Sequence, residues 1–222
     1  RTIDKRQRTF RDMASEDKMN KILDQNKGRF YEFGHHISHA ANSFYTSDFE
    51  KSLIITMDAG GWEEDGTRQC FSIQEGVDNK IKTLKMLPKS EIDLGGIWYS
   101  GTKQIFGLSV GYPLGDQAGT VMAMATLGKP KYADLFSDYR GNLQKLQTIA
   151  NTSEQEKFNV AASLQEFTEA KFRNNVKDFM PGHTNLCLSG GVSLNCVMLG
   201  KIKTWFPNIK NIFCDPVPYD AG

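Results

Sequence analysis

The chain has 222 residues, with 27 Lys or Arg against 26 Asp or Glu, so its formal net charge is +1. This balance excludes a protein that binds nucleic acid through bulk positive charge. Hydrophobic residues make up 39% of the sequence, and no stretch approaches the roughly 20 consecutive apolar residues of a membrane-spanning helix. The composition is typical of a globular protein with one large domain or two small lobes.

The four cysteines are scattered and form no CxxC pair, which predicts neither a zinc knuckle nor a disulfide framework. Free cysteines and the absence of a signal-peptide core in the first thirty residues favour a cytoplasmic location. The chain opens on Arg1 inside a charged helical pattern and stops in an Asp-Ala-Gly turn at 220–222. We therefore expect a fragment of a longer protein, truncated at both ends.

Hydrophobic periodicity divides the first half of the chain into helices and then a β-meander. A buried, β-branched strand is expected at 52–57, and the turn Asp58-Ala59-Gly60-Gly61 is expected to end it. Helices are expected at 4–25 and from the His cluster to Phe44, an extended segment at 28–33, and further strands at 69–75 and 80–87.

The second half is predicted to be helical before it returns to a strand-turn-helix-strand unit. The full order, antiparallel strands followed by helices and then βαβ, predicts an α/β fold with a mixed sheet flanked by helices. Helices are expected at 95–107, 116–127, 154–179 and 192–205, a loop at 111–115, and strands at 184–188 and 211–214.

A histidine cluster provides the first candidate site. His35 and His39 stand four residues apart, which places both imidazoles on one face of the predicted helix. Such a pair can bind one divalent metal ion, because imidazole is the commonest protein ligand for transition metals. The alternative is a polar helix start with solvated histidines. Three of the four histidines of the chain fall within five residues, which favours the metal.

Two acidic turns provide the next candidates. Asp58 and Asp220 each follow a predicted strand and precede glycines. An Asp in this position can ligate a metal while free backbone N–H groups, here near Gly60 and Gly61, face an anion. The alternative for each turn is a plain Asp-Gly turn. Two neutral histidines and two carboxylates would balance a divalent ion, and an open position on it could polarise a carbonyl or phosphoryl group.

A glycine pair lies between the strand predicted at 184–188 and the helix after it. The sequence Ser189-Gly190-Gly191 lets a ligand approach the backbone, and a helix N-terminus favours anions. The motif lacks the spacing of a Rossmann or P-loop site, and by itself such a turn is often structural.

Together these motifs resemble the O-carbamoyltransferases, the family of the nodulation and antibiotic-tailoring carbamoyltransferases. The resemblance runs from about residue 28 to the end. Four blocks carry it, and the first and third are the most specific: His35-His36-Ile37-Ser38-His39-Ala40, Met57-Asp58, Leu188-Ser189-Gly190-Gly191-Val192-Ser193-Leu194-Asn195-Cys196-Val197 and Tyr219-Asp220-Ala221-Gly222.

The resemblance implies an actin-like ATPase (ribonuclease H-like) fold, related to the tRNA threonylcarbamoyl transferase subunit. Residues 1–222 would form part of the N-terminal, metal-binding domain, without the YrdC-like domain. A divalent metal, iron above all, would be held by His35, His39, Asp58 and Asp220. Adenylate contacts would come from Ser189, Gly190, Gly191 and Asn195.

The implied activity is the metal-assisted transfer of a carbamoyl group from carbamoyl adenylate to a hydroxyl of a small-molecule acceptor. The YrdC-like domain of the full-length chain would make the adenylate from carbamoyl phosphate and ATP. Neither a membrane nor a nucleic acid is expected as a partner. The alternatives are a tRNA threonylcarbamoyl transferase relative, which would act on nucleic acid, and a non-catalytic nucleotide-binding module of the same fold.

His36 is assigned as the catalytic residue, as a group beside the metal ligands or facing the substrate. The alternative is that its ring only packs the helix. Two positions depart from the family pattern. Thr120 stands where the family usually has a lysine, and Asp58-Ala59-Gly60-Gly61-Trp62-Glu63 replaces the usual Asp-Gly-x-Gly-Glu.

Overall fold

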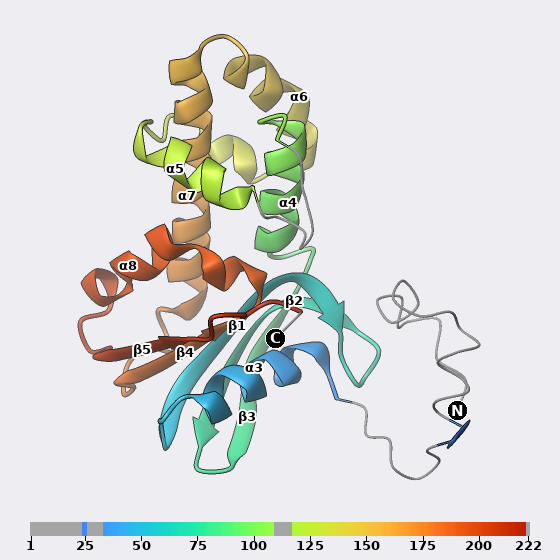
Figure 1. The fold of residues 1–222 in the computed structure, drawn as a ribbon, viewed down its shortest axis with the longest axis vertical. Coiled ribbons are helices and arrows are strands. Elements are labelled where there is room, and N and C mark those ends of the chain that lie inside the picture. Colours follow the sequence, from blue (N-terminus) through green and yellow to red (C-terminus); the bar gives the residue numbers. More distant parts are fainter. Residues whose placement is uncertain (1–23, 26–32, 109–116, 221–222) are drawn as a thin grey trace.

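The fold is described from a computed structural model of the chain, which places residues 24–25, 33–108 and 117–220. Most of the helix predicted at 4–25, most of the extended segment at 28–33 and the whole loop at 111–115 lie outside these residues. Figure 1 shows two parts in the described chain, a curved sheet with helices on it and a helical lobe above the sheet.

A five-stranded mixed sheet with the order β3-β2-β1-β4-β5 forms the centre of the lower part. The first three strands are antiparallel neighbours, whereas β4 runs parallel to β1 and β5 runs parallel to β4. This confirms the predicted meander followed by a βαβ unit. The strands are β1 (Lys51–Trp62), β2 (Arg68–Val77), β3 (Lys80–Pro88), β4 (Asn185–Ser189) and β5 (Asn211–Cys214).

The predicted end of the first strand is wrong. β1 does not stop at Met57 but continues to Trp62, and its pairing with β2 shifts register between Met57 and Gly61. Gly60 lies in this interval with a φ of +113°, a backbone conformation that favours glycine. Such irregularities bend a strand and redirect a side chain. Asp58 therefore projects from an interrupted stretch of β1 and not from a turn after it.

Each face of the sheet is covered by helices from a different part of the sequence. The helix α3 (His35–Thr46) packs its Ala40 and Phe44 with Ile54 of β1 on one face. Because side chains alternate along a strand, the neighbours of Ile54 point to the opposite face. There they join a core with α8 (Cys196–Trp205) and the C-terminal half of α7 (Glu154–Val176).

The upper lobe has its own hydrophobic core, built on the N-terminal half of α7. It also contains α4 (Leu94–Gln104), α5 (Ala118–Thr126) and α6 (Tyr139–Ala150). A single long helix thus takes part in both cores. The sequence analysis predicted three of these helices and did not predict α6 or the 3₁₀ helix η1 (Ala133–Phe136) before it.

The start of the helix predicted at 192–205 also needs correction. The glycine pair leads into a four-residue 3₁₀ helix, η2 (Gly191–Leu194), and α8 begins only at Cys196. The side chain of Asn195 accepts a hydrogen bond from the Met198 N–H and so caps α8. Among the described helices, none is long and apolar enough to cross a membrane.

Candidate metal centre

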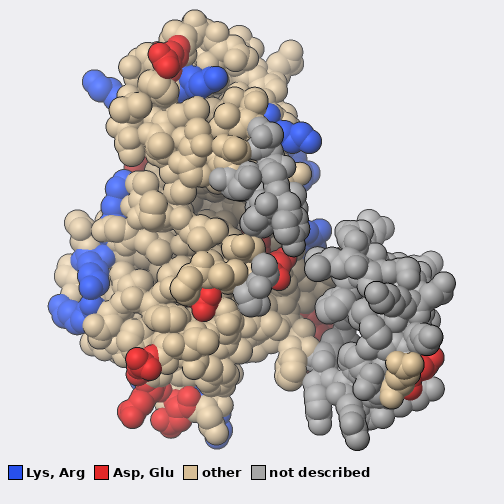
Figure 2. All heavy atoms as spheres, in the orientation of Figure 1, with Lys and Arg blue, Asp and Glu red and all other residues tan. Residues whose placement is uncertain are grey.

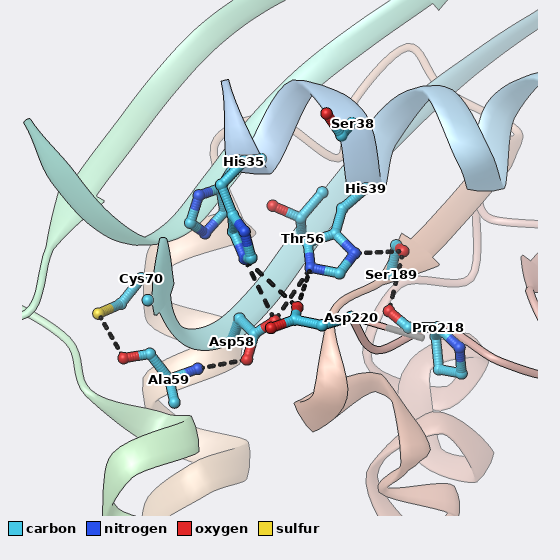
Figure 3. Close-up of polar contacts among 12 residues, drawn as sticks. His35, Ser38, His39, Thr56, Asp58, Ala59, Cys70, Ser189, Pro218 and Asp220 are labelled. Atoms are coloured by element: carbon cyan, nitrogen blue, oxygen red, sulfur yellow. Dashed lines mark hydrogen bonds and ion pairs between the residues drawn. The ribbon is translucent and has the colours of Figure 1, made fainter. Parts of the chain in front are cut away.

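Four side chains from three distant segments converge at the edge of the sheet. His35 and His39 project from the same face of α3, Asp58 projects from β1, and Asp220 follows β5. One ligand atom from each lies within 4.8 Å of all the others. Figure 3 shows the two imidazoles pointing towards the two carboxylates. The structure thus brings together the four residues that the sequence proposed as metal ligands.

The separations within this cluster leave room for a small ion. His39 Nε2 lies 3.0 Å from Asp58 Oδ2 and 3.2 Å from Asp220 Oδ1. His35 Nε2 lies 3.4 Å and 3.7 Å from the same two oxygens. It is buried and has no hydrogen-bond partner among the described residues. A buried lone pair facing two carboxylates fits a divalent metal, and two imidazoles with two carboxylates are ligands typical of transition-metal ions.

The electrostatics of the cluster favour a positive charge at its centre. Burial alone would lower the pKa of His39, but the hydrogen bonds and charges of Asp220 and Asp58 outweigh it and raise the pKa to about 9. Burial would likewise raise the pKa of Asp58, but His35 and His39 hold it well below its usual value. The two carboxylates thus favour a positive charge next to them, whether a proton on His39 or a cation.

Gly60 and Gly61 pack within the protein at this site. A Cβ atom at Gly61 would overlap the imidazole of His35, so the glycine lets the ring lie directly on the β1 backbone. The carbonyl of Gly60 accepts a hydrogen bond from the guanidinium of Arg68. Both glycines thus have a structural reason to be present, and their contact with a cofactor stays a prediction.

The loop after β4 holds the segment that carries Asp220. The Gly190 N–H donates to the carbonyl of Pro218 at 2.7 Å, and the Ser189 hydroxyl donates to the same carbonyl at 3.3 Å. Gly190 has a φ of +84°, and a Cβ atom there would overlap the carbonyl of Met57. The loop therefore packs tightly against β1, and its predicted contacts with an adenylate stay predictions.

Asn195 uses its side chain inside the protein. Besides capping α8, it donates from Nδ2 to Gln165 Oε1 at 2.9 Å, and only 4% of the residue is exposed. Gln165 in turn lines a cavity of about 280 Å³ between α5, α7 and α8, together with Glu169 and Lys201. A direct contact between Asn195 and an adenylate stays a prediction.

The expected place of His36 facing the substrate is wrong, whereas its expected place beside the metal ligands stays a prediction. Its side chain is fully buried, and its Nδ1 lies 2.7 Å from Oε1 of Glu63. The structure therefore corrects the expectation of a substrate-facing His36, because the ring is enclosed between α3 and the end of β1. The sequence analysis missed Glu63 as a contact of the site. Its signal was the acidic residue that closes the block from Asp58 to Glu63.

Comparison with known proteins identifies the family of the chain. The family described as "Carbamoyltransferase N-terminus" matches residues 5–222. The chain belongs to this carbamoyltransferase family. The match includes all four residues of the candidate metal centre.

The relatives of this carbamoyltransferase chain include two nodulation proteins. NolNO of Sinorhizobium fredii is 30% identical over 210 residues, covering 85% of this chain and 29% of the relative. NolO of Bradyrhizobium diazoefficiens is also 30% identical over 210 residues, covering 85% of this chain and 36% of NolO. An uncharacterized protein of Synechocystis, sll1178, is 29% identical over 226 residues, covering 85% of this chain and 34% of sll1178. The chain therefore spans about a third of the length of these relatives.

Two solved structures share the fold at low sequence identity. HypF of T. kodakarensis superposes with a TM-score of 0.54 at 14% identity, covering 91% of this chain and 36% of HypF. An activator of 2-hydroxyisocaproyl-CoA dehydratase from Clostridium difficile superposes with a TM-score of 0.50 at 13% identity, covering 81% of this chain and 59% of the activator. These similarities confirm the expected ATPase-like α/β fold, a mixed sheet flanked by helices.

Proposed function

We propose that this chain is the metal-bearing transferase region of an O-carbamoyltransferase, which passes a carbamoyl group from carbamoyl adenylate to a hydroxyl of a small molecule. The observation that carries the proposal is the convergence of His35, His39, Asp58 and Asp220 in a member of the carbamoyltransferase family. These four side chains would hold a divalent ion, for which iron is our first candidate.

Three of the four side chains of the cluster are shielded from solvent, since those of His35, His39 and Asp58 are 22%, 9% and 16% exposed. When bound there, a divalent ion supplies Lewis acidity towards a carbonyl oxygen or an acceptor hydroxyl.

The proposed transfer needs no reactant besides carbamoyl adenylate and the acceptor. The acceptor hydroxyl oxygen forms a bond with the carbamoyl carbon, and the bond from that carbon to the phosphate oxygen of the mixed anhydride breaks. Adenylate leaves with the electron pair, and the hydroxyl proton is released to solvent. Three of the four ligands lie on α3 and β1, which are regular elements that would hold them in place during this step.

The loop after β4 supports the proposed adenylate site. Gly191 lies next to the cluster, since a Cβ atom at that position would be 3.8 Å from Asp58 Oδ1. An adenylate phosphate at Gly191 would therefore sit beside the carbonyl that reacts. The dehydratase activator, which shares the fold, was solved with bound ADPNP. ATP or carbamoyl adenylate binding on this side of the chain is part of the proposal.

The remaining parts of the reaction are assigned to other segments of a longer protein. Since the chain spans about a third of its relatives, we propose that a YrdC-like domain of the full protein makes carbamoyl adenylate from carbamoyl phosphate and ATP. The proposed location is the cytoplasm. On the face seen in Figure 2, Lys and Arg are dispersed and form no continuous basic band on the described surface, which favours a small acceptor over a nucleic acid.

The proposal is tested with the full-length protein and with a form that lacks the YrdC-like domain. Each is given carbamoyl adenylate, or carbamoyl phosphate with ATP, and a polyhydroxylated acceptor. Mass spectrometry should show an acceptor gain of one carbamoyl group from carbamoyl adenylate in both forms. Carbamoyl phosphate with ATP should give the carbamoylated acceptor only with the full-length form. Transfer of a threonylcarbamoyl group to tRNA, with no carbamoylation of the small acceptor, would instead support the tRNA threonylcarbamoyl transferase alternative.

A further inference from the structure

Glu63 is held at the start of the β1–β2 hairpin with its carboxylate turned inward. Its backbone N–H donates to the carbonyl of Thr67 at 2.9 Å, and its own carbonyl accepts from the Gly66 N–H at 2.9 Å. Only 7% of the Glu63 side chain is exposed. The carboxylate is therefore largely removed from solvent. A buried carboxylate needs hydrogen-bond or charged partners to offset the cost of its desolvation.

Those partners lie in the first turn of α3. Glu63 Oε1 accepts a hydrogen bond from the backbone N–H of His36 at 3.1 Å and lies 2.7 Å from Nδ1 of the same residue. The N-cap of α3 is Gly34, which has no side chain to satisfy the free N–H groups of the first turn. A Cβ atom at Gly34 would overlap Glu63 Oε2. Glu63 thus caps α3 from another element, where a negative charge is favourable.

The contact also fixes the ring of His36. A carboxylate only accepts, so Nδ1 must carry the proton and donate it to Glu63. The Nε2 atom of His36 is buried and has no hydrogen-bond partner among the described residues. A proton on Nε2 would have no acceptor there, so the neutral Nδ1–H tautomer fits the site. The ring is therefore held in one orientation by Glu63.

The segment from Asp58 to Glu63, which begins in β1 and ends just after it, therefore touches all three histidines of α3. Asp58 contacts His39, the backbone at Gly61 contacts the ring of His35, and the carboxylate that follows β1 contacts His36. His36 lies about 100° around the helix from His35, as the 3.6-residue period requires. Two contacts on one face of α3 and one on another fix both the rotation and the axial position of the helix on β1.

We infer that Glu63 is a positioning residue for the metal centre. By fixing the first turn of α3 on β1, it holds His35 and His39 at the spacing from Asp58 that a single ion needs. The inference deepens the proposed function and rests on it, because it assumes that the four-residue cluster binds a metal. Groups that orient metal ligands without touching the ion typically contribute 10–100-fold to metal affinity.

The test is a Co²⁺ titration of the purified full-length protein, followed by the visible absorption of the bound ion. Glu63→Ala should weaken Co²⁺ binding by about 10–100-fold. Glu63→Gln should weaken it less, because its amide oxygen still accepts both hydrogen bonds. Glu64→Gln is the matched control, because it changes the neighbouring carboxylate, which is exposed, and it should bind Co²⁺ as the wild type does. Thermal unfolding without metal measures the effect of each variant on folding alone.

A purely structural role for Glu63 would lower the melting temperature of the metal-free chain and leave the Co²⁺ affinity of the folded variant unchanged. That result overturns the inference. If Glu63→Ala does not fold, Glu63→Gln and the imidazole ¹⁵N spectrum of the wild-type chain decide. His36 should show the Nδ1–H tautomer, and the Nε2–H tautomer would overturn the inference. The titration uses no carbamoyl donor, so its result does not depend on whether the transfer assay succeeds. A wild-type protein that binds no Co²⁺ would contradict both this inference and the proposed function.

Discussion

The imidazole of His39 and the hydroxyl of Ser189 lie 3.5 Å apart, on the side of the ring away from the carboxylates. His39 thus faces Asp58 and Asp220 with Nε2 and Ser189 with Nδ1. Histidines that bind metals usually donate their second ring N–H to such a partner, which fixes the tautomer and orientation of the ring. Ser189 also donates to Pro218 and so connects His39 to the segment that carries Asp220.

Replacement of Ser189 by Ala should weaken metal binding while the fold persists. The change removes the partner of His39 Nδ1 and one hydrogen bond to Pro218, which should cost about 1 kcal/mol of unfolding free energy. The metal affinity should fall by about tenfold. Ser38→Ala is the control, because among the described residues the Ser38 hydroxyl donates to the carbonyl of Gly34, the N-cap of α3, and not to a residue of the cluster. Equal affinities of the two variants for Co²⁺ would contradict this role of Ser189.

His39→Ala should abolish metal binding and, in the full-length enzyme, carbamoyl transfer. His39 is only 8% exposed and contacts two carboxylates, so its loss should also affect stability. We therefore expect a cost of about 1–3 kcal/mol, typical of a buried carboxylate that loses a partner. Elemental analysis measures the metal and urea unfolding measures the stability. An active, metal-replete variant would refute the assignment of His39.

Two glycine substitutions should change stability in opposite directions. Gly190→Ala places a Cβ atom against the Met57 carbonyl at a φ of +84°, so we expect a loss of at least about 1–3 kcal/mol. Gly200→Ala lies inside α8 with nothing within 4 Å of the added atom, so it should gain about 0.5–1 kcal/mol. Urea unfolding of both variants checks the signs. A neutral Gly190→Ala would show that the loop does not need its tight packing on β1.

Acid should weaken a contact between β1, β2 and the loop that connects α7 to β4. The Lys51 ammonium at 3.2 Å and the His183 ring at 3.1 Å hold the pKa of Glu75 below its usual value of 4.5. A carboxyl whose pKa is lower in the folded state stabilises the fold above the unfolded pKa, and this contribution disappears as the pH falls through the folded pKa. His183, whose side chain is 13% exposed, is thus a partly buried partner of Glu75.

Glu75→Gln should accordingly reduce the acid sensitivity of the chain. Its unfolding free energy should lie below that of the wild type near neutral pH, and the difference should shrink below about pH 4.5, because the wild type then loses the same charge. Urea unfolding at a series of pH values measures this difference. A difference that stays constant down to strongly acidic pH would show that the charge of Glu75 contributes nothing.

The sequence by itself determined most of the secondary structure and half of the candidate site. The β-branched run in β1 and the long amphipathic pattern of α7 depend on neighbours along the chain, and they appear where they were expected. The spacing of His35 and His39 is local too, because four residues make about one turn of helix. Local rules therefore sufficed to place the two histidines on one face.

Only the tertiary structure decided how the distant parts meet. Asp220 reaches Asp58 because β4 pairs in parallel with β1 and β5 with β4, which brings segments more than 150 residues apart to one edge of the sheet. The irregular pairing of β1 redirects Asp58, and the hairpin that follows places Glu63 under α3. Such contacts depend on strand register and helix packing, which periodicity along the chain does not encode. The same reason explains why the sequence suggested a catalytic His36 and the structure shows a buried one.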